Sequence, residues 1–433
     1  MSGMQSPATT TPLTFAVIGC GARARAYMEL AMQQPELHRI TAVADPVAAR
    51  SGFIASLEQR GGVKSFEYGE ELLAGPKLAD VALISTQDRD HFGQARMALE
   101  SGYDVLLEKP AAGSIEEVAE LSRLASALNR KVILCFVLRY TPFYKKVKEV
   151  VDSGRLGEIL DIQMVEGVEP WHFAHSFVRG HWAKSADSTP LMVAKCCHDT
   201  DIMSWLVGSR CTSLSSSGET GYFNLAHAPA NAPQRCTDGC EHSQQCPYDA
   251  RRYASDKREP WLPQIMPAPQ EATAEEVLDW VAGHQWGRCV FRCDNDAPDH
   301  QNTSMTFESG VTASLLLTAF DAGRRINIRG TKAHLQGGLH IDGVPYKLCI
   351  RDHFTGDTDI LSIDDGSGQS GYESHGGGDQ GLVQTLYPTF KETGAIECRA
   401  SLLKDSIEGH RIAFASEVAR LTGQTVHLTQ TSK

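Results

Sequence analysis

Short apolar runs alternate with amphipathic stretches between Leu13 and about Val137, and this alternation limits the folds that the chain can adopt. The apolar runs are TFAVI, ITAVAD, VALIS, DVLL and VILCFV, and helical patterns separate them at 24–33, 47–60, 92–101 and 115–128. Strands that alternate with helices form parallel sheets covered on both faces. We therefore predict an α/β chain with a doubly wound domain over residues 13–138.

The pattern changes after Tyr140. One helix is predicted over 142–153, and long strand-like runs follow, such as GEILDIQMVEGV, TSMTFE, VTASLLLTA, RRINIRG and KAHLQGGL. Strands joined by short turns predict a large, mostly antiparallel sheet in an α+β domain over 139–400. A segment rich in Pro, Cys and Gly, about 222–269, is predicted to be a loop insertion. Residues 1–12 are expected to be a flexible tail, and 401–433 a helix that returns to the first domain.

Composition narrows the class of partner. With 433 residues the chain exceeds the size of one hydrophobic core, so two domains are expected. The net charge of −12 argues against a nucleic-acid partner. No apolar stretch of about 18 residues and no secretion signal is present, so we expect a soluble cytoplasmic protein without a membrane partner.

A glycine loop follows the first predicted strand. In TFAVIGCGARARAYMELA, Gly19 permits a tight turn, Gly21 allows a pyrophosphate to approach the backbone, and Ala24 allows close helix packing. Asp45 ends the second predicted strand, where a carboxylate binds the adenosine ribose and repels a 2′-phosphate. We therefore predict that residues 13–138 form a dinucleotide-binding Rossmann domain and that its cofactor is NAD rather than NADP.

The tripeptide Glu108, Lys109, Pro110 closes the apolar run DVLL. A residue at the carboxyl end of a buried parallel strand points into the crevice where open α/β sheets bind ligands. Lys109 is therefore placed for chemistry.

Taken together, GCGARA, AVADP, STQDRDH, LLEKP and CHDTDIMSWLVG resemble the Gfo/Idh/MocA family of oxidoreductases. The resemblance implies hydride transfer between NAD and a secondary hydroxyl of a carbohydrate: a sugar, cyclitol or glycoside. It also implies that Lys109 reaches the reacting hydroxyl and that His198 is the acid/base. The candidate cofactor-binding residues are Gly19, Gly21, Ala22, Arg23, Ala24, Asp45, Thr86, Gln87, His91, Glu108 and Lys109.

One position departs from the family's commoner pattern. That pattern has an aspartate four residues before the histidine, where this chain has Ala194 followed by Lys195. The role of the aspartate is then absent or passes to Asp199, Asp201 or Lys195. Lys195 is therefore a third candidate catalytic residue.

Polar residues among aromatics predict a carbohydrate pocket, because a sugar offers hydroxyls to bond and an apolar face to stack. The stretch WHFAHSFVRGHW has this composition, and SHGGGDQG adds His375 and Asp379 on a glycine-rich loop. The candidate substrate-binding residues are Arg139, His172, His175, Arg179, Lys195, Asp201 and His375.

The insertion carries a cluster of cysteines. Cys236, Cys240 and Cys246 follow one another closely, and Cys289 and Cys293 come later. Three thiolates with a fourth from the later pair suit a structural zinc ion, or an iron–sulfur cluster. Free thiols and disulfides are equally compatible with the spacing.

Two other functions are compatible with the same motifs. A redox-assisted glycosidase would oxidise the sugar, eliminate the aglycone, add water and return the hydride to a tightly held NAD. A sensing protein on this scaffold would bind NAD or sugar without turnover. In each case the open face of the predicted sheet favours a homo-oligomer, a dimer or tetramer.

Overall fold

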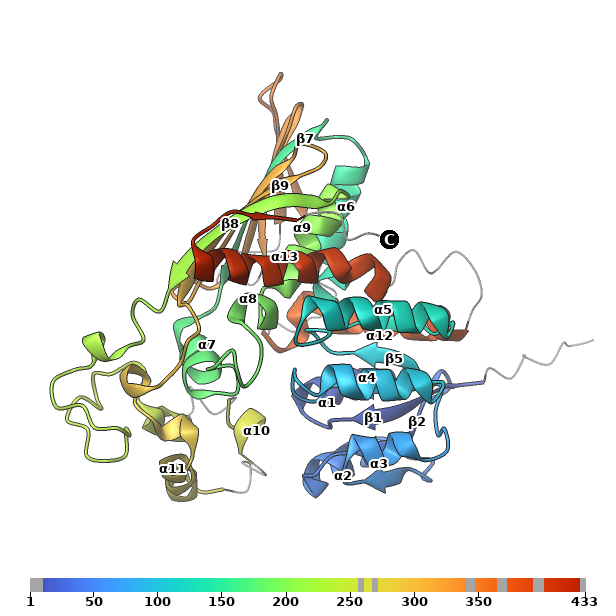
Figure 1. The fold of residues 1–433 in the computed structure, drawn as a ribbon, viewed down its shortest axis with the longest axis vertical. Helices are drawn as coiled ribbons and strands as arrows, with labels where there is room; N and C mark the ends of the chain where they lie inside the picture. The colour runs from blue at the N-terminus through green and yellow to red at the C-terminus, as the bar shows by residue number, and fades with distance from the viewer. Residues whose placement is uncertain are drawn as a thin grey trace, which may run out of the picture. The chain divides into compact units, whose positions relative to one another are not determined.

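The computed structural model of the protein describes residues 11–255, 261–266, 272–339, 347–363, 372–391 and 401–428. The chain divides into two compact units (Figure 1). The first comprises Met1–Ala111, Ala119–Cys135 and Asp379–Lys404, and the second Ala112–Val118, Phe136–Gly378 and Asp405–Lys433. Most of the expected 1–12 tail lies outside the described residues.

The first unit contains the predicted parallel sheet. Its described strands have the order β3-β2-β1-β4-β5-β6, and all neighbouring pairs are parallel. The strands are β1 (Leu13–Ile18), β2 (His38–Ala44), β3 (Lys64–Phe66), β4 (Val81–Ile84), β5 (Asp104–Leu107) and β6 (Val132–Leu134). The α/β class is thereby confirmed. β3 escaped the sequence prediction because it is short, polar and at the sheet edge.

Helices follow the strands of this sheet as expected for a doubly wound unit. They are α1 (Ala22–Ala31), α2 (Ala48–Ser56), α3 (Gly69–Ala74), α4 (His91–Glu100) and α5 (Ile115–Ala127). Figure 1 shows α3, α4 and α5 stacked beside one another. Central strands such as β4 and β5 have fully buried Val and Leu side chains, which is why their sequences read as unbroken apolar runs.

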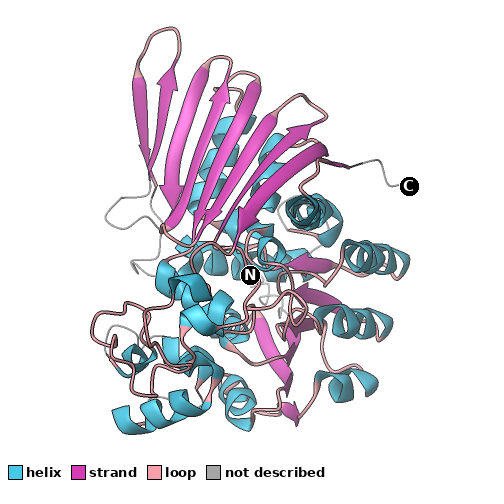
Figure 2. Cartoon of the chain, turned by 60° about the vertical axis from the view of Figure 1, so that its left-hand side comes forward, coloured by secondary structure: helices cyan, strands magenta, loops and turns pink. Residues whose placement is uncertain are grey.

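The second unit contains the predicted large sheet, with the described order β14-β13-β12-β11-β7-β10-β9-β8-β15. Its strands are β7 (Ile159–Gly167), β8 (Cys211–Glu219), β9 (His300–Phe307), β10 (Thr312–Thr318), β11 (Gly323–Gly330), β12 (Ala333–Leu339), β13 (Lys347–Asp352), β14 (Thr358–Ser362) and β15 (Val426–His427). Only β7 and β10 pair in parallel among these strands. Strict alternation of buried and exposed residues in β9 means that one face of the sheet is covered and the other open (Figure 2).

The covered face packs against helices of the same unit, including α9, which contacts β7 and β10. The helical segments are η1 (Val137–Tyr140), α6 (Pro142–Asp152), α7 (Pro170–Phe173), the π-helical η2 (Ala174–Arg179), α8 (Leu191–Ala194), α9 (Cys197–Val207) and α13 (Leu403–Thr422). Thr141 caps α6 by accepting from Tyr144 N–H, and Pro142 occupies its first position. This cap explains why the 142–153 helix was readable from sequence.

The C-terminal part of the chain differs from the prediction. The segment that rejoins the first unit is 379–404, which holds most of α12 (Gly378–Lys391), whereas α13 belongs to the second unit from Asp405 onward. Polar contacts tie α13 to the second unit: Thr200 Oγ1 donates to Gly409 O at 2.8 Å, and Cys211 N–H donates to Glu408 Oε1 at 2.8 Å. Such long-range contacts leave no periodic signal in the sequence.

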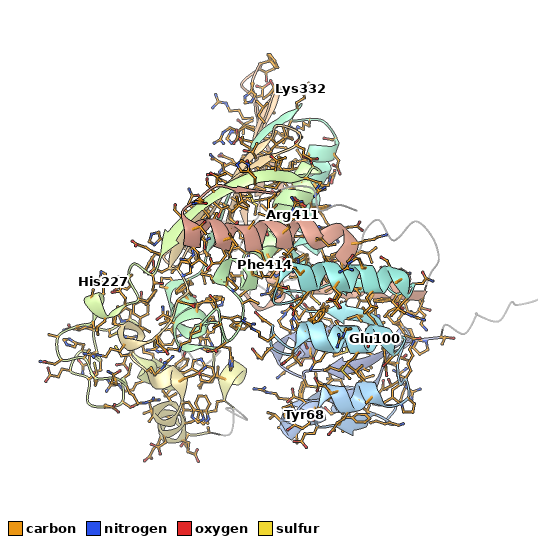
Figure 3. All side chains as sticks on the ribbon, in the orientation of Figure 1. Tyr68, Glu100, His227, Lys332, Arg411 and Phe414 are labelled. Atoms are coloured by element: carbon orange, nitrogen blue, oxygen red, sulfur yellow. The ribbon has the colours of Figure 1, made fainter. Side chains whose placement is uncertain are left out.

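The insertion also differs from the prediction of a plain loop. It contains η3 (Leu225–His227), η4 (Ala250–Ala254) and α10 (Leu262–Ile265), and α11 (Ala274–Gly283) follows it. Tyr253 and Leu262 pack into a buried apolar cluster with Trp171, Val281 and Trp286. Figure 3 labels His227 near the start of this segment. The cluster was not predicted because residues outside 222–269 complete it.

No described helix combines the length and the apolar character needed to span a membrane.

Candidate functional site

The loop after β1 has the backbone geometry of a dinucleotide cradle. Gly19 has a φ of +79°, and a Cβ there would lie 2.7 Å from the carbonyl carbon and oxygen of Ser85, so only glycine fits. Gly21 is the N-cap of α1, where no side chain caps the helix and a Cβ would meet nothing within 4 Å. The helix N-terminus therefore faces open space, as an anion site requires.

Asp45 is tied to this loop. Its side chain is 8% exposed, Cys20 N–H donates to Oδ2 at 2.8 Å, and Val47 N–H donates to Oδ1 at 2.8 Å. The carboxylate thus joins the end of β2 to the glycine loop. A fixed negative charge at this point is the feature that disfavours a 2′-phosphate.

Arg23, in the first turn of α1, is held by three groups of the first unit. It donates to Glu108 Oε1 at 3.0 Å, to Asp379 Oδ1 at 2.6 Å and to Tyr27 Oη at 2.6 Å. Burial by itself would raise the pKa of Glu108, but Arg23 and Lys109 outweigh it and lower that pKa. Glu108 therefore stays ionised and fixes both Arg23 and the start of the Lys109 segment.

Asp379 was singled out from SHGGGDQG only as part of a loop. The structure gives it a partner 356 residues away, Arg23, at the glycine loop. His375 precedes α12, is half-buried and has a φ of +44°.

Lys109 immediately follows β5 and is half-buried, and its backbone N–H donates to Glu108 Oε2 at 2.9 Å. Because β1, β4 and β5 are consecutive neighbours in a parallel sheet, Gly19, Thr86 and Lys109 all follow the carboxyl ends of adjacent strands. The sheet reverses its strand order between β1 and β4, which is where ligands bind in open α/β sheets. The sequence-predicted loop, Thr86 and Lys109 are therefore brought to one edge.

The remaining cofactor candidates divide by exposure. Gln87 and Ala22 are exposed, Thr86 is half-buried, and Ala24 is buried against the sheet. His91 is 1% exposed and its ring lies between Pro110 O at 2.7 Å and Thr86 O at 3.3 Å. His91 thus connects the backbone after β4, at Thr86, with the backbone after β5, at Pro110. This role differs from the predicted direct contact with a cofactor.

In the second unit, His198 lies in the first turn of α9 and is 6% exposed. Its ring centroid is 5.6 Å from that of Phe136, which also packs against His410 at 5.3 Å. An aromatic wall of this kind restricts the orientation of the imidazole.

Each aspartate proposed to replace the missing one has an arginine partner. Arg139 donates to both oxygens of Asp201 at 2.6 Å, and Arg324 Nε donates to Asp199 Oδ1 at 2.9 Å. Burial raises the pKa of Asp201, although Arg139 acts in the opposite direction. The Arg139–Asp201 pair anchors η1 to α9, so both residues are structural in this arrangement rather than open to a substrate.

Lys195 belongs to a second charged network. Its Nζ lies 3.4 Å from Glu166 Oε1, and Arg324 Nε lies 2.8 Å from Glu166 Oε2. Burial raises the pKa of Glu166, with Asp199 adding to the effect against Arg324 and Lys195. Glu166 and Arg324 were missed by sequence reasoning; their signal is a charged residue at the inward-facing end of a strand.

The WHFAHSFVRGHW residues turn toward the insertion. His175 Nδ1 lies 2.7 Å from Tyr253 Oη, and burial, with smaller effects of Arg179 and His181, lowers the pKa of His175 to about 3. The ring of His172 lies 4.9 Å from that of Trp261. Arg179 is 0% exposed. The predicted roles of His175 and Arg179 in binding substrate are at odds with this burial, because the aromatic insertion covers them.

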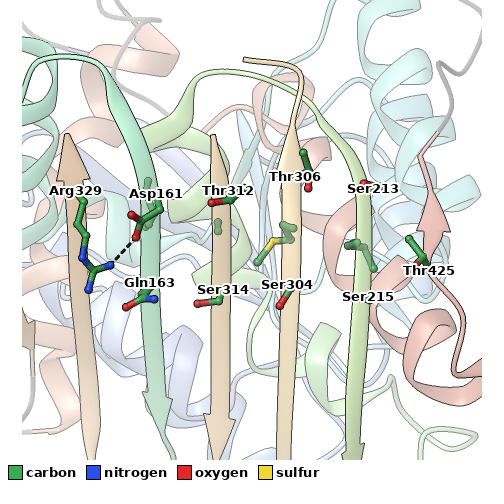
Figure 4. A pocket seen from close by; sticks show the side chains of 14 residues that line it. Asp161, Gln163, Ser213, Ser215, Ser304, Thr306, Thr312, Ser314, Arg329 and Thr425 are labelled. Atoms are coloured by element: carbon green, nitrogen blue, oxygen red, sulfur yellow. Dashed lines mark hydrogen bonds and ion pairs between the residues drawn. The ribbon is translucent and has the colours of Figure 1, made fainter. Parts of the chain in front are cut away.

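The open face of the large sheet carries a shallow groove of about 630 Å³, which crosses β11, β7, β10, β9 and β8. Figure 4 shows Ser and Thr side chains from adjacent strands lining it, with Arg329 Nη1 bonded to Asp161 Oδ1 at 2.6 Å. The described lining of the groove is about half polar and half apolar, and it contains no Cys, His or Lys side chain.

Part of the chain matches a known family model. Residues 13–136 match the family model described as Gfo/Idh/MocA, oxidoreductase family, NAD-binding Rossmann fold. YteT of Bacillus subtilis is 23% identical over 59% of this chain and 60% of its own length, and an inositol 2-dehydrogenase of Corynebacterium glutamicum is 28% identical over 51% and 61%. The chain thus spans about three fifths of these relatives.

A solved structure shares the whole fold. An oxidoreductase from Agrobacterium radiobacter, in complex with NAD+, L-tartaric acid and magnesium, aligns over 96% of this chain and 98% of its own, with a TM-score of 0.67 and 15% identity. At this identity the similarity concerns the fold alone.

Proposed function

We propose that this chain, whose residues 13–136 match the Gfo/Idh/MocA NAD-binding family, is an NAD-dependent oxidoreductase that acts on a secondary hydroxyl of a sugar, cyclitol or glycoside. The observation that carries the proposal is the edge of the first sheet, where Gly19 and the uncapped start of α1 follow β1, and Lys109 follows β5, with β4 between the two strands. The inositol dehydrogenase among the relatives supports the substrate class.

The chain's residues fit a dinucleotide. The positive φ of Gly19 and the open space at Gly21 admit a pyrophosphate to the helix N-terminus, and Asp45 is fixed beside that loop. NAD, when bound, supplies the acceptor for the hydride of the alcohol carbon. Thr86 and Gln87 follow β4 at the same edge and are the candidates for further contacts.

Lys109 and His198 divide the proton chemistry. Oxidation of a secondary alcohol breaks its C–H bond, whose electron pair leaves as hydride, and its O–H bond, whose proton must pass to a base. We assign the proton to His198, since imidazole titrates near neutral pH, and the stabilisation of the developing alkoxide to the ammonium of Lys109. Glu108 accepts a hydrogen bond from Lys109 N–H, which fixes the backbone from which the lysine side chain extends.

Lys195 is proposed as a second cation of the substrate site. Glu166 positions it, and Arg324 holds Glu166 in turn. Asp199 and Asp201 are engaged by Arg324 and Arg139, so neither carboxylate replaces the missing aspartate, and Lys195 places a positive charge in this part of the site instead. His172 and His375 are kept as candidate substrate contacts.

The experiment is NAD binding followed by a turnover screen. Calorimetry of the purified protein should give saturable NAD binding, with NADP at least about tenfold weaker, because Asp45 opposes its phosphate. Asp45→Asn removes the charge but keeps an acceptor for Cys20 N–H, and should reduce that preference. Cyclitols, sugars and glycosides are then tested for NADH formation. Failure to bind NAD or NADP would refute the proposal.

The same screen distinguishes the dehydrogenase from the redox-assisted glycosidase and from the sensing protein. Release of a chromogenic aglycone without net NADH would favour the redox-assisted mechanism over a simple dehydrogenase. No reaction, with NAD bound and no effect of replacing Lys109 or His198, would favour a sensing role.

We further propose a homo-oligomer that uses the open face of the large sheet. Its support is the uncovered face across β7 to β11, where Ser304 and Ser314 lie in the groove. Light scattering should give a mass above that of one chain, and Ser314→Arg should lower it. A monomeric wild-type protein would exclude this proposal.

A further inference from the structure

A small cavity in the second unit is lined by four cysteines. It has a volume of about 20 Å³, and Cys236, Cys240, Cys246 and Cys289 belong to its wall. About 10–15 Å³ is enough for one water-sized particle, so the cavity has room for a single small ion. His242 and Asp249 also line it, but His242 Nε2 lies 2.8 Å from Ala230 O, and Asp249 is paired with Arg251 at 2.8 Å. The thiols are therefore its available donors.

The backbone brings two of these cysteines to one face. Arg235 and Arg288 form an antiparallel bridge, in which Cys236 N–H donates to Gly287 O at 2.9 Å and Cys289 N–H donates to Gln234 O at 2.9 Å. Residues flanking a bridge on either side point to the face opposite the bridge pair. Cys236 and Cys289 are thus diagonal neighbours on the same face, although 53 positions separate them in sequence.

The buried guanidinium of Arg179 lies beside the thiol of Cys236. Arg179 is 0% exposed, its Nε donates to Arg288 O at 2.7 Å, and its Nη2 donates to Tyr248 O at 2.6 Å and lies 3.6 Å from Cys236 Sγ. Its Nη1 is buried without a hydrogen-bond partner. Within the described chain no carboxylate pairs with this guanidinium. A buried charge needs a counter-charge, and neutral thiols do not supply one.

We propose that Cys236, Cys240, Cys246 and Cys289 bind one structural Zn²⁺ as thiolates, with Arg179 as the counter-cation of the complex. Four thiols release four protons on binding, and the resulting tetrathiolate carries a charge of −2 that Arg179 partly neutralises. Donation from a guanidinium to a ligating sulfur is the kind of outer contact that stabilises thiolate ligands. Among the described residues no three His, Cys, Asp or Glu side chains lie close enough together to hold a metal ion, so the proposal requires the four thiols to approach one another when the ion binds.

Two alternatives fit the cavity less well. All the described cysteines are free thiols, and Cys236 and Cys289, as diagonal neighbours of a ladder about 7–8 Å apart, exceed the span of a disulfide. An iron–sulfur cluster has several heavy atoms and needs more room than one ion. Zinc with four thiolates matches the donor set and the volume.

Cys293 supplies a matched control. It lies four residues from Cys289, but its Sγ donates to Cys289 O at 3.3 Å and it is not part of the cavity wall. The proposal therefore separates two neighbouring cysteines: one is a ligand and the other is not.

The test measures metal in the full-length purified protein. Plasma mass spectrometry should find about one zinc per chain in the wild type and in Cys293→Ser. Cys240→Ser, at a half-buried position where the change disturbs the fold least, should hold less than about half of that amount under the same conditions. Equal zinc in Cys240→Ser and Cys293→Ser would overturn the assignment, as would wild-type protein with under about 0.2 equivalents after growth with added zinc.

A second measurement needs no variant. Titration with an organomercurial should release zinc to a chromogenic chelator with about four thiols consumed per ion. Replacement by Co²⁺ should give the strong visible absorption of a tetrahedral thiolate site. Iron with acid-labile sulfide, or zinc released without consumption of thiols, would contradict the tetrathiolate proposal.

Discussion

Each unit of the molecule holds a buried glutamate beside an arginine and a lysine, and the pKa values of the two glutamates shift in opposite directions. In the first unit Arg23 and Lys109 lower the pKa of Glu108 below its usual range, against the effect of burial. In the second unit burial raises the pKa of Glu166, and Arg324 and Lys195 do not offset it. The same three residue types thus produce opposite shifts.

The difference comes from the neighbours that complete each network. Glu108 also accepts from Tyr27 Oη at 2.6 Å and from Lys109 N–H at 2.9 Å, and both favour the ionised form. Glu166 instead shares Arg324 with Asp199, so a second carboxylate competes for the same cation. An arginine beside a buried acid therefore does not by itself determine the direction in which the pKa of that acid shifts.

The largest effect is expected at Lys109. If its ammonium stabilises the alkoxide, Lys109→Met should lower kcat by about 10³-fold while NAD binding persists. Steady-state kinetics measures kcat, and calorimetry measures NAD binding. Lys77→Met, at an exposed lysine that donates to Gly102 O, is the control and should leave kcat unchanged. Unaltered turnover in Lys109→Met would remove this lysine from the mechanism.

A smaller effect is expected at Lys195. A single cation in a partly buried site is worth about 1.4–2.8 kcal/mol, so Lys195→Met should lower kcat/KM about 10- to 100-fold. The pH dependence of kcat/KM should also shift, because loss of a positive charge from the proposed site raises the pKa of the proposed acid/base, His198. Lys195→Arg, which keeps the charge, should restore most of the activity. A fall in activity with no change in the pH profile would indicate a purely structural role.

Glu108→Gln should reduce the free energy of unfolding by about 2 kcal/mol at neutral pH, because Arg23 loses one of its two buried carboxylates. The folded-state pKa of Glu108 lies below the unfolded value of 4.5. Its stabilisation is therefore present above pH 4.5 and lost as the pH falls through the folded-state pKa. Urea unfolding between pH 3 and 7 should show a flatter acid limb in the variant. An identical acid limb would mean that Glu108 is not the group responsible.

The smallest effect is expected for Glu166→Gln, about 1 kcal/mol, since an amide replaces a carboxylate that burial already disfavours. The sign of its pH dependence is opposite. Because the folded-state pKa lies above the unfolded value of 4.5, stability falls as the pH rises from 4.5 through the folded-state pKa. In the Glu166→Gln variant the stability should no longer fall with rising pH, and urea unfolding at several pH values measures this. A larger loss of stability than in Glu108→Gln would reverse the comparison.

Local patterns were sufficient for the features that depend on neighbouring residues. The alternation of strands and helices predicted the parallel sheet, and Gly19, Gly21 and Lys109 were identified from their places directly after strands. These features are readable because periodicity and turn chemistry act over a few positions along the chain.

The sequence by itself determined the class of fold, the dinucleotide loop and the strand end that carries Lys109. Only the tertiary structure decided which side chains meet: Asp379 with Arg23 across 356 positions, Asp199 with Arg324 across 125, and Arg179 with the thiol of Cys236 across 57. The reason is physical. A buried charge is defined by whatever the fold places within a few ångströms of it, and that neighbourhood depends on strand order and packing, which leave no local pattern in the chain.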